Sequence, residues 1–431
     1  MKQLVSLLLI CFATNHCNAQ TDYFPPTNSD DWETLPIDSL NWCQDKVDAM
    51  VDFVGDNNSK AFIILKDGKI VVEEYYGTFT QDSSWYWASA GKTLTAFLVG
   101  LAQDQGFLNI DNPSSDYLGE GWTSLTPQQE AEITVRNQLT MTSGLDYTGE
   151  QDCTDPECLT YLNAPGENWY YHNAPYTRLD GVLENATGSN LNLYVFNQLT
   201  SLTGVSGAYF SPDYNNVFFS KPRSMARFGH LLLNEGVWDG LTILNDNDYF
   251  QSMTTPSQEL NEAYGYLTWL NSEDTFMIPS TEFIFPGNIM PNAPAEVYSA
   301  QGKNGQILNI VPSQGLVVVR MGDLAAEDGL ISIMFNNSIW EYINDLECDP
   351  MSVQEISTDQ ITIYPNPTSS IVNIETAFDS EFSVAIMDRT GRLALEVKNQ
   401  YELDVSGLSA GIYALQITSG TEVYSHKLIV E

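Results

Sequence analysis

Residues 85–99 read WYWASAGKTLTAFLV, an aromatic run followed by a long apolar segment that is typical of a buried helix. Ser89 and Lys92 lie three residues apart at the start of this segment. Because side chains three apart share one face of a helix, the Lys92 amine can reach the Ser89 hydroxyl proton. The pattern is that of a nucleophile with its own base. Taken alone, it also fits a helix N-cap serine followed by a surface lysine, so other motifs must decide between the two.

Composition limits the class of protein. The chain has 431 residues, 43% of them hydrophobic and 12% aromatic, which is enough for two or three structural units with large cores. Its 17 basic and 56 acidic residues give a formal net charge of −39. A surface this acidic repels phosphate backbones, so we expect no nucleic-acid partner.

The N-terminus has the layout of a cleaved secretory signal over residues 1–20. Lys2 precedes the apolar run at residues 4–10, and the segment closes on Asn18-Ala19-Gln20. The apolar run is too short for a membrane anchor, and no other segment reaches transmembrane length. A buried N-terminal helix is the alternative.

Export changes the interpretation of the cysteines. Four remain after the signal: Cys43, Cys153, Cys158 and Cys348. An even number in an oxidising compartment predicts disulfides, with three possible pairings. We expect a local Cys153–Cys158 bridge across a turn, which leaves Cys43 to pair with Cys348. Metal binding is the alternative, but the spacing lacks paired Cys-x-x-Cys knuckles.

Residues 21–352 mix helical and strand patterns. Strand patterns at both ends, with helices between them, predict one α/β domain whose terminal segments share a sheet. The expected elements are an amphipathic helix at 42–54, a hairpin of strands 61–65 and 70–72 that turns at Asp67-Gly68, strands at 306–311 and 315–321, and a second amphipathic helix at 330–346.

Further motifs follow in a fixed order. Tyr171-His172-Asn173 is a Tyr-x-Asn after the Pro165-Gly166 turn, and Ala300-Gln301-Gly302-Lys303 leads into a strand. With the Ser-x-x-Lys, these motifs resemble the penicillin-recognising serine hydrolases, the group of class C β-lactamases, D-aminopeptidases and family VIII carboxylesterases. Over about residues 40–345 other stretches resemble the same family: Ile133 to Arg136, Leu139 to Leu145, Ala226 to Gly229, and Tyr264 to Tyr266.

The resemblance implies an α+β, serine β-lactamase/transpeptidase-like domain, with an antiparallel sheet flanked by helices and a helical insert. It implies that Ser89 forms an acyl-enzyme, that Lys92 is the base, and that Tyr171 shares the proton. Lys92 then needs a pKa well below about 10.4, which burial supplies. Asn173 matches a position that orients lysine and substrate. The Ser89 amide and one near Lys303 would form the oxyanion hole.

The third motif departs from the family pattern. Ala300-Gln301-Gly302 stands where Lys-Thr-Gly or His-x-Gly is usual, so the cation that would hold a substrate carboxylate is missing. Gln301, Gly302 and Lys303 are expected to border the substrate, and Lys303 either replaces the missing charge or points to solvent. The departure argues against efficient β-lactam or peptidoglycan hydrolysis and favours an ester or a small amide.

Rival catalytic patterns are weaker. Ser409 lies in a Gly-x-Ser-x-Gly, but a strand pattern follows it, whereas a nucleophile elbow needs a helix. His230, on an expected helix, reads as a structural histidine. Nothing in the sequence suggests zinc, a nucleotide or another cofactor.

Residues 353–431 form a separate unit of alternating strands and turns, which predicts a small β-sandwich. Ile361 to Thr368 opens it, and it ends at the chain terminus. It resembles the C-terminal sorting domain of type IX secretion cargo. A carbohydrate-binding or adhesive module is the alternative. The resemblance implies passage through the periplasm, handling by the type IX machinery, and a secreted or surface location.

The sequence therefore predicts a secreted serine hydrolase acting on a small-molecule ester or amide. The alternative is a non-catalytic binding or sensor protein that keeps the fold.

Overall fold

The computed structural model describes residues 22–211, 213–271, 274–325, 333–348, 361–376, 381–420 and 422–431. The expected signal at 1–20 and the expected boundary between residues 352 and 353 lie outside these ranges. The chain divides after Cys348 into two compact units, which are described separately.

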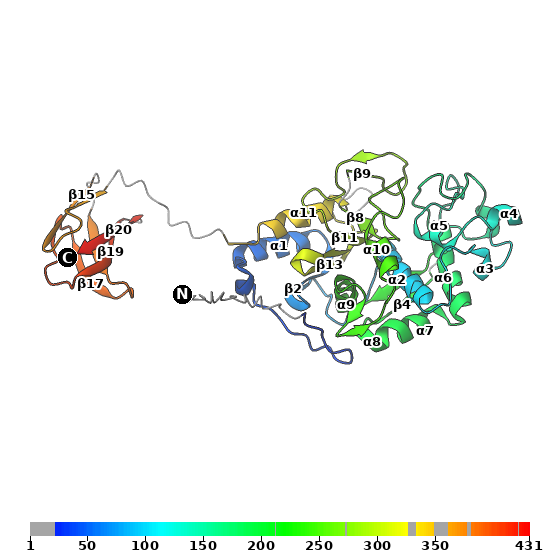
Figure 1. Ribbon diagram of the computed structural model, residues 1–431, viewed down its shortest axis with the longest axis horizontal. Coiled ribbons are helices and arrows are strands. Elements are labelled where there is room, and N and C mark those ends of the chain that lie inside the picture. Colours follow the sequence, from blue (N-terminus) through cyan, green and yellow to red (C-terminus); the bar gives the residue numbers. More distant parts are fainter. Residues whose placement is uncertain are drawn as a thin grey trace, which may run out of the picture. The chain divides into compact units, whose positions relative to one another are not determined.

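A six-stranded antiparallel sheet organises the first unit, in the order β2-β1-β13-β12-β11-β8 (Figure 1). The two ends of the unit meet in it, because β1 pairs with β13 from Ala61↔Met321 to Lys66↔Leu316. The prediction that the terminal segments share a sheet is confirmed. The strands are β1 Ser59–Lys66, β2 Lys69–Tyr75, β8 Trp269–Leu270, β11 Tyr298–Gly302, β12 Gln306–Val311 and β13 Leu316–Gly322.

Helices cover both faces of this sheet (Figure 1). Helices α1 (Gln44–Asp56) and α11 (Ile333–Asn344) lie together on one face, and α9 (Pro222–Leu233) packs on the other. Because both faces are covered, every residue of β12 and β13 is buried, which explains their continuous apolar runs. The predicted helix at 330–346 is α11; residues 330–332 lie outside the described ranges.

A largely helical insert separates β2 from β8. Its central helix α2 (Gly91–Asp104) buries every residue from Gly91 to Ala102 and packs on α6 (Asn173–Thr187). The other helices are α3 Ser115–Leu118, α4 Pro127–Glu130, α5 Val135–Leu139, α7 Leu191–Val195, α8 Ser201–Thr203 and α10 Asn247–Thr254. A small sheet in the order β3-β5-β4 comprises β3 Trp85–Tyr86, β5 Val217–Ser220 and β4 Gly207–Phe210.

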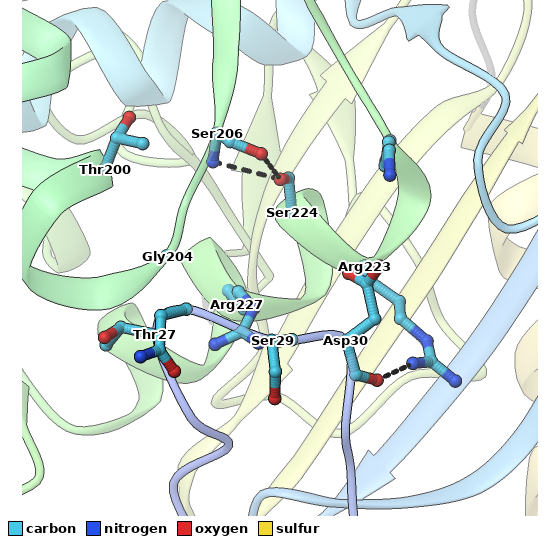
Figure 2. A pocket seen from close by; sticks show the side chains of 11 residues that line it. Thr27, Ser29, Asp30, Thr200, Gly204, Ser206, Arg223, Ser224 and Arg227 are labelled. Carbon is cyan, nitrogen blue, oxygen red and sulfur yellow. Dashed lines mark hydrogen bonds between the residues drawn. The ribbon is translucent and has the colours of Figure 1, made fainter.

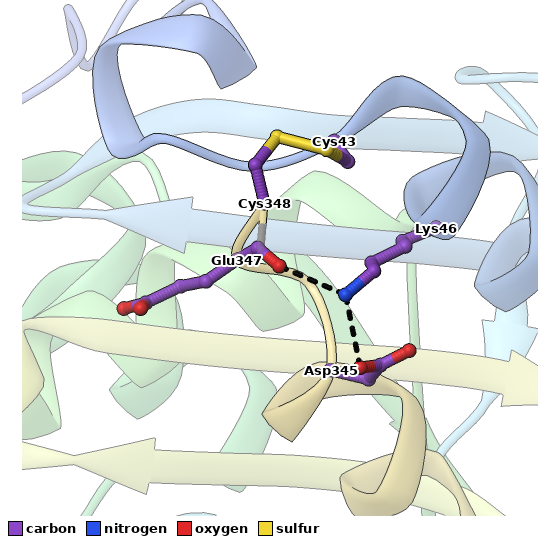
Figure 3. Close-up of a disulfide and its surroundings, with 5 residues drawn as sticks. All are labelled: Cys43, Lys46, Asp345, Glu347 and Cys348. Carbon is purple, nitrogen blue, oxygen red and sulfur yellow. Dashed lines mark hydrogen bonds and ion pairs between the residues drawn. A yellow bond between two sulfur atoms is a disulfide. The ribbon is translucent and has the colours of Figure 1, made fainter. Parts of the chain in front are cut away.

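Two disulfides join the cysteine pairs expected from the sequence. Cys43–Cys348 connects the start of α1 to the segment after α11, across 305 residues (Figure 3). Lys46 reinforces this junction by donating to the Asp345 carboxylate at 3.1 Å and the Glu347 carbonyl at 3.0 Å. Cys153–Cys158 closes a local loop in the insert. The first bridge therefore ties together the two ends of the hydrolase-like unit.

The second unit is a small β-sandwich. One sheet has the order β14-β15-β18 and the other β17-β16-β19-β20. Its core is made by alternate residues, such as Val372 and Ile374 on β15 and Val384 and Ile386 on β16. The strands are β14 Ile361–Tyr364, β15 Ile371–Thr376, β16 Phe382–Met387, β17 Leu393–Lys398, β18 Glu402–Asp404, β19 Gly411–Ser419 and β20 Glu422–Val430.

Candidate active site

Ser89 lies in a tight turn between β3 and α2. It is the middle residue of a single 3₁₀ turn, Ala88–Ala90, and the preceding Ala88 has φ 47°, a left-handed conformation that costs a non-glycine residue energy. Buried Trp87 anchors the turn by donating its indole N–H to Ser220 Oγ at 2.8 Å. The turn leaves Ser89 half-buried, in contrast to the buried helix that follows it.

Lys92 projects from the first turn of α2 toward Ser89. Its Nζ lies 3.4 Å from Ser89 Oγ, and the side chain is 4% exposed. Burial lowers the pKa of Lys92 to about 7, although the charges of Asp152 and Asp180 act in the opposite direction. The buried lysine that the sequence argument requires is therefore present, with a substantial neutral fraction near pH 7.

Two aromatic rings flank the Lys92 amine, with centroids 5.1 Å (Tyr171) and 4.0 Å (Tyr176) from Nζ. The Tyr176 hydroxyl lies 3.2 Å from Thr95 Oγ1, which lies 3.1 Å from the Tyr209 hydroxyl. These rings hold the amine in place and favour its charged form. No sequence pattern assigned Tyr176 a role, because only the packing of α6 on α2 brings its ring to the Lys92 amine.

Tyr171 is buried in an aromatic cluster. Its ring stacks on Trp269 at 5.8 Å and meets Tyr264 edge-on at 6.1 Å. Burial raises the pKa of Tyr171 well above 10, although the nearby Ser89 side chain acts in the opposite direction. Tyr171 therefore stays protonated at neutral pH and can donate a proton but not serve as a free tyrosinate base.

Asn173 begins α6. Its Nδ2 donates to Asp152 at 2.7 Å, while its Oδ1 is buried without a hydrogen-bond partner among the described residues. Asp152 belongs to the loop before the Cys153–Cys158 bridge. No sequence pattern pointed to Asp152, because only the folding of that loop brings it to the Tyr-x-Asn segment.

The end of β11 runs directly beside the Ser89 turn. A Cβ atom on Gly302 would lie 2.4 Å from the Trp87 carbonyl oxygen and 2.8 Å from the Ala90 nitrogen, so only glycine allows this approach. Lys303 follows, with an exposed side chain. Within the described chain, the N–H groups of Ser89 and Lys303 take no part in backbone hydrogen bonds, as oxyanion donors require.

Buried Arg320 holds the turn after Lys303. Its Nη1 donates to the carbonyl oxygens of Asn304 at 2.6 Å and Gly305 at 2.9 Å. A guanidinium with fixed donors is well suited to this clamp. The β11–β12 turn is thereby tied to β13.

Gln301 has a different environment from its neighbours. Its buried Nε2 donates to Ser299 Oγ at 3.0 Å and lies 3.9 Å from Met290 Sδ. The described contacts of this side chain are thus within the fold, and its role toward a substrate stays a prediction.

The rival candidates do not form a second catalytic group. Ser409 lies in the loop that leads into strand β19, so the helix that a nucleophile elbow requires does not follow it. His172 and His230 are buried, and burial lowers the pKa of each to about 4. Within the described ranges, no group of three or more His, Cys, Asp or Glu residues is arranged to hold a metal ion.

A cavity of about 270 Å³ lies away from these residues, between residues 27–30 and the start of α9 (Figure 2). Its three cations are already engaged. Arg223 binds Glu73 at 2.6 and 2.7 Å, Lys221 binds Asp82 at 2.6 Å, and Arg227 donates to backbone carbonyls. Each of the three cations in the cavity wall therefore already has partners within the fold.

Comparison with known families finds two matches. The β-lactamase family matches residues 47–324, and the secretion system C-terminal sorting domain matches residues 362–431. An uncharacterised protein from Alkalihalophilus pseudofirmus is 24% identical over 303 residues, which cover 62% of this chain and 84% of that protein.

Solved structures share the fold. A Bacillus anthracis protein provisionally assigned as a 6-aminohexanoate-dimer hydrolase has a TM-score of 0.56 and 17% identity, over 75% of this chain and 89% of its own. A provisionally assigned β-lactamase from Bacteroides dorei has a TM-score of 0.56 and 18% identity, over 71% and 99%. Simvastatin synthase from Aspergillus terreus has a TM-score of 0.51 and 16% identity, over 71% and 98%.

The sorting domain indicates the location of the protein. A type IX secretion C-terminal domain directs its carrier to the outside of the cell or to its outer surface. Among the described helices, none combines the length and the apolar character that crossing a bilayer demands. Since the family match includes the Ser89 turn, Lys92 and the central sheet, this chain is a member of the β-lactamase family, with the serine hydrolase fold of that family.

Proposed function

We propose that the protein hydrolyses an ester or a small amide through an acyl-enzyme on Ser89. The observation that carries the proposal is the buried amine of Lys92, 3.4 Å from Ser89 Oγ, with its pKa lowered to about 7. A lysine at its usual pKa, about 10.4, would be almost fully protonated at neutral pH and unable to accept the serine proton.

The chemistry follows from these positions. Neutral Lys92 takes the Ser89 proton while Oγ attacks the substrate carbonyl carbon. The N–H groups of Ser89 and Lys303 stabilise the oxyanion. Tyr171, which stays protonated, passes a proton to the leaving group and is reprotonated from Lys92. A water molecule then attacks the acyl-enzyme carbonyl while Lys92 accepts its proton. Lys92 returns this proton to Ser89 Oγ as the acyl bond breaks, which releases the acid and restores neutral Lys92.

The substrate class is argued from charge. Ala300 supplies no cation beside the Ser89 turn, and Gln301 is bonded to Ser299. A site of this kind lacks the usual partner for the carboxylate of a β-lactam or a peptidoglycan stem. This favours esters and small amides over those substrates.

Secretion through a cleaved signal at residues 1–20, with residues 21–352 as the hydrolase and 353–431 as the sorting unit, completes the proposal.

A fluorophosphonate probe tests the assignment of Ser89 on the full chain. The Ser89 oxygen should displace fluoride, and peptide mapping should place one adduct on the peptide that contains Ser89. Hydrolysis of short-chain nitrophenyl esters and D-amino-acid amides should fall in proportion to labelling; a chromogenic cephalosporin serves as the β-lactam member of the panel. An adduct on another serine, or turnover that survives full labelling, would contradict the proposal. Labelling of Ser89 with no turnover of any panel member would support the binding or sensor protein.

The pH dependence tests Lys92 as the base. Because neutral lysine is the active form, kcat/KM for an uncharged ester should rise with pH through about 7 and level off above pH 8. A profile that is flat from pH 5 to 9 would contradict this assignment.

Asp180 provides the control, because burial raises the pKa of its carboxyl to about 7 as well. Asp180→Asn removes that titration, so the rise should persist if Lys92 causes it. The midpoint of the kcat/KM profile should move to lower pH, because loss of the Asp180 negative charge disfavours the protonated form of Lys92. Disappearance of the rise in Asp180→Asn would assign it to the carboxyl.

A further inference from the structure

A carboxylate, that of Asp152, lies next to the Tyr-x-Asn segment of the candidate site. Asp152 accepts a hydrogen bond from Asn173 Nδ2 at 2.7 Å, and its charge influences both Lys92 and His172. Asp152 is half-buried, so part of the carboxylate is accessible. Asn173 is the only hydrogen-bond donor to it among the described residues, which leaves acceptor sites for another group.

The loop that carries Asp152 is anchored to the catalytic segment. The Gln151 carbonyl oxygen accepts from the Ala174 backbone N–H at 2.9 Å, and Gln151 Nε2 donates to the Tyr170 hydroxyl at 2.8 Å. The Cys153–Cys158 bridge closes the loop immediately after Asp152. These contacts fix the carboxylate relative to the Tyr-x-Asn segment, as a specificity residue requires.

A purely structural role does not account for Asp152. In the described chain the carboxylate accepts from the Asn173 side chain and from no backbone N–H group of α6, so it does not cap that helix. No ion pair is formed by Asp152 in the described part of the chain, although it is next to a disulfide that could have anchored the loop without a charge. Lys92 is a cation only in its protonated form, so its attraction for Asp152 is lost when the amine acts as a base. A half-buried carboxylate with a single hydrogen-bond donor is then poorly solvated, and a cationic ligand would recover that energy.

From this arrangement we infer that Asp152 binds an ammonium group of the substrate, so that the preferred substrates are amine-bearing esters or amides such as aminoacyl derivatives. The inference rests on the proposed Ser89 hydrolysis and specifies its substrate class. The absence of a cation at Ala300 and the net charge of −39 agree with it, since an acidic surface attracts cationic substrates. Asn173 holds the carboxylate in position by its amide N–H.

Matched substrates test the inference on the full chain. The methyl ester and the amide of alanine, in both enantiomers, are compared with the same compounds acetylated on nitrogen. At pH 7 we expect kcat/KM to be at least tenfold higher for the free amine in at least one of these pairs. The preference should fade above about pH 8, where an α-amino group loses its proton.

Asp152→Asn should lower the ratio of kcat/KM for the free-amine substrate to kcat/KM for its acetylated counterpart about tenfold or more. The asparagine keeps an oxygen that can accept from Asn173, and an unchanged thermal midpoint verifies the fold. Glu150→Gln is the matched control: it removes an exposed charge from the same loop and should leave the ratio as it is in the natural chain.

The outcomes separate this inference from the function on which it rests. Turnover that Ser89→Ala abolishes, with equal rates on free and acetylated substrates, overturns the role of Asp152 and leaves the hydrolase intact. A preference that survives Asp152→Asn also overturns that role. Absence of Ser89-dependent turnover on all of these substrates and on the wider ester and amide panel overturns both.

Discussion

Ser89→Ala is expected to lower kcat by roughly 10⁴-fold or more on any substrate that the protein hydrolyses. Alanine removes the only atom that can form the acyl bond, while Lys92, Tyr171 and the oxyanion donors remain. The fold should tolerate the change, because Ser89 is half-buried and contributes one long contact, at 3.4 Å to Lys92. The measurement is steady-state turnover of the substrates that the natural chain hydrolyses, with mass spectrometry of the quenched enzyme to detect the acyl adduct.

Ser84→Ala is the matched control, since Ser84 is exposed five residues earlier on the same segment. It should keep full turnover and the adduct on Ser89. If Ser89→Ala retained more than a tenth of the natural turnover, another nucleophile would have to be responsible.

Gly302→Val is expected to lower kcat/KM by roughly 10²–10³-fold, the usual cost of losing an oxyanion donor. A Cβ at this position would lie 2.4 Å from the Trp87 carbonyl oxygen and 3.1 Å from the Ser89 nitrogen. The contact forces the end of β11 away from the Ser89 turn, and so displaces the Lys303 N–H that we propose as the second oxyanion donor. The expected loss is therefore mainly in kcat, and fluorophosphonate labelling of Ser89 should slow in parallel.

A control variant shows whether a loss of activity comes from the displaced β11 or from a general effect of replacing a glycine. Gly149→Ala places a methyl group where no atom lies within 4 Å, and it should leave turnover unchanged. The thermal midpoint of Gly302→Val is measured beside it, because strain in β11 can also destabilise the sheet. A folded Gly302→Val with natural kcat/KM would show that this approach of β11 is not needed for the chemistry.

Much of the candidate site could be predicted because its motifs are local. Ser89 and Lys92 are adjacent on one helix by spacing alone, and Tyr171 and Asn173 lie within one short segment. The hairpin at Asp67-Gly68 was predictable from its turn residues, which have φ of 48° and 80° in the structure. The closure of the sheet by β1 and β13 followed from strand patterns at both ends of the unit.

Other features depend on contacts between segments that are distant in sequence. The Tyr176 ring reaches the Lys92 amine because α6 packs on α2. Asp152 reaches Asn173 because its loop is hydrogen-bonded to the start of α6. The environment of Gln301, bonded to Ser299 and near Met290, has no signature in the Ala300-Gln301-Gly302 pattern. Neither kind of contact leaves a periodic signal that could be recognised along the chain.

By itself, the sequence determined which residues are candidates for the chemistry, the pairing of the terminal strands and the presence of a sorting unit, because spacing along a helix or strand and turn composition are local properties. Only the tertiary structure decided the protonation of the site. The pKa of Lys92 depends on how completely α2 is buried and on how near folding brings Asp152 and Asp180. Desolvation and Coulomb interactions act between atoms that are close in space, whatever their separation in sequence.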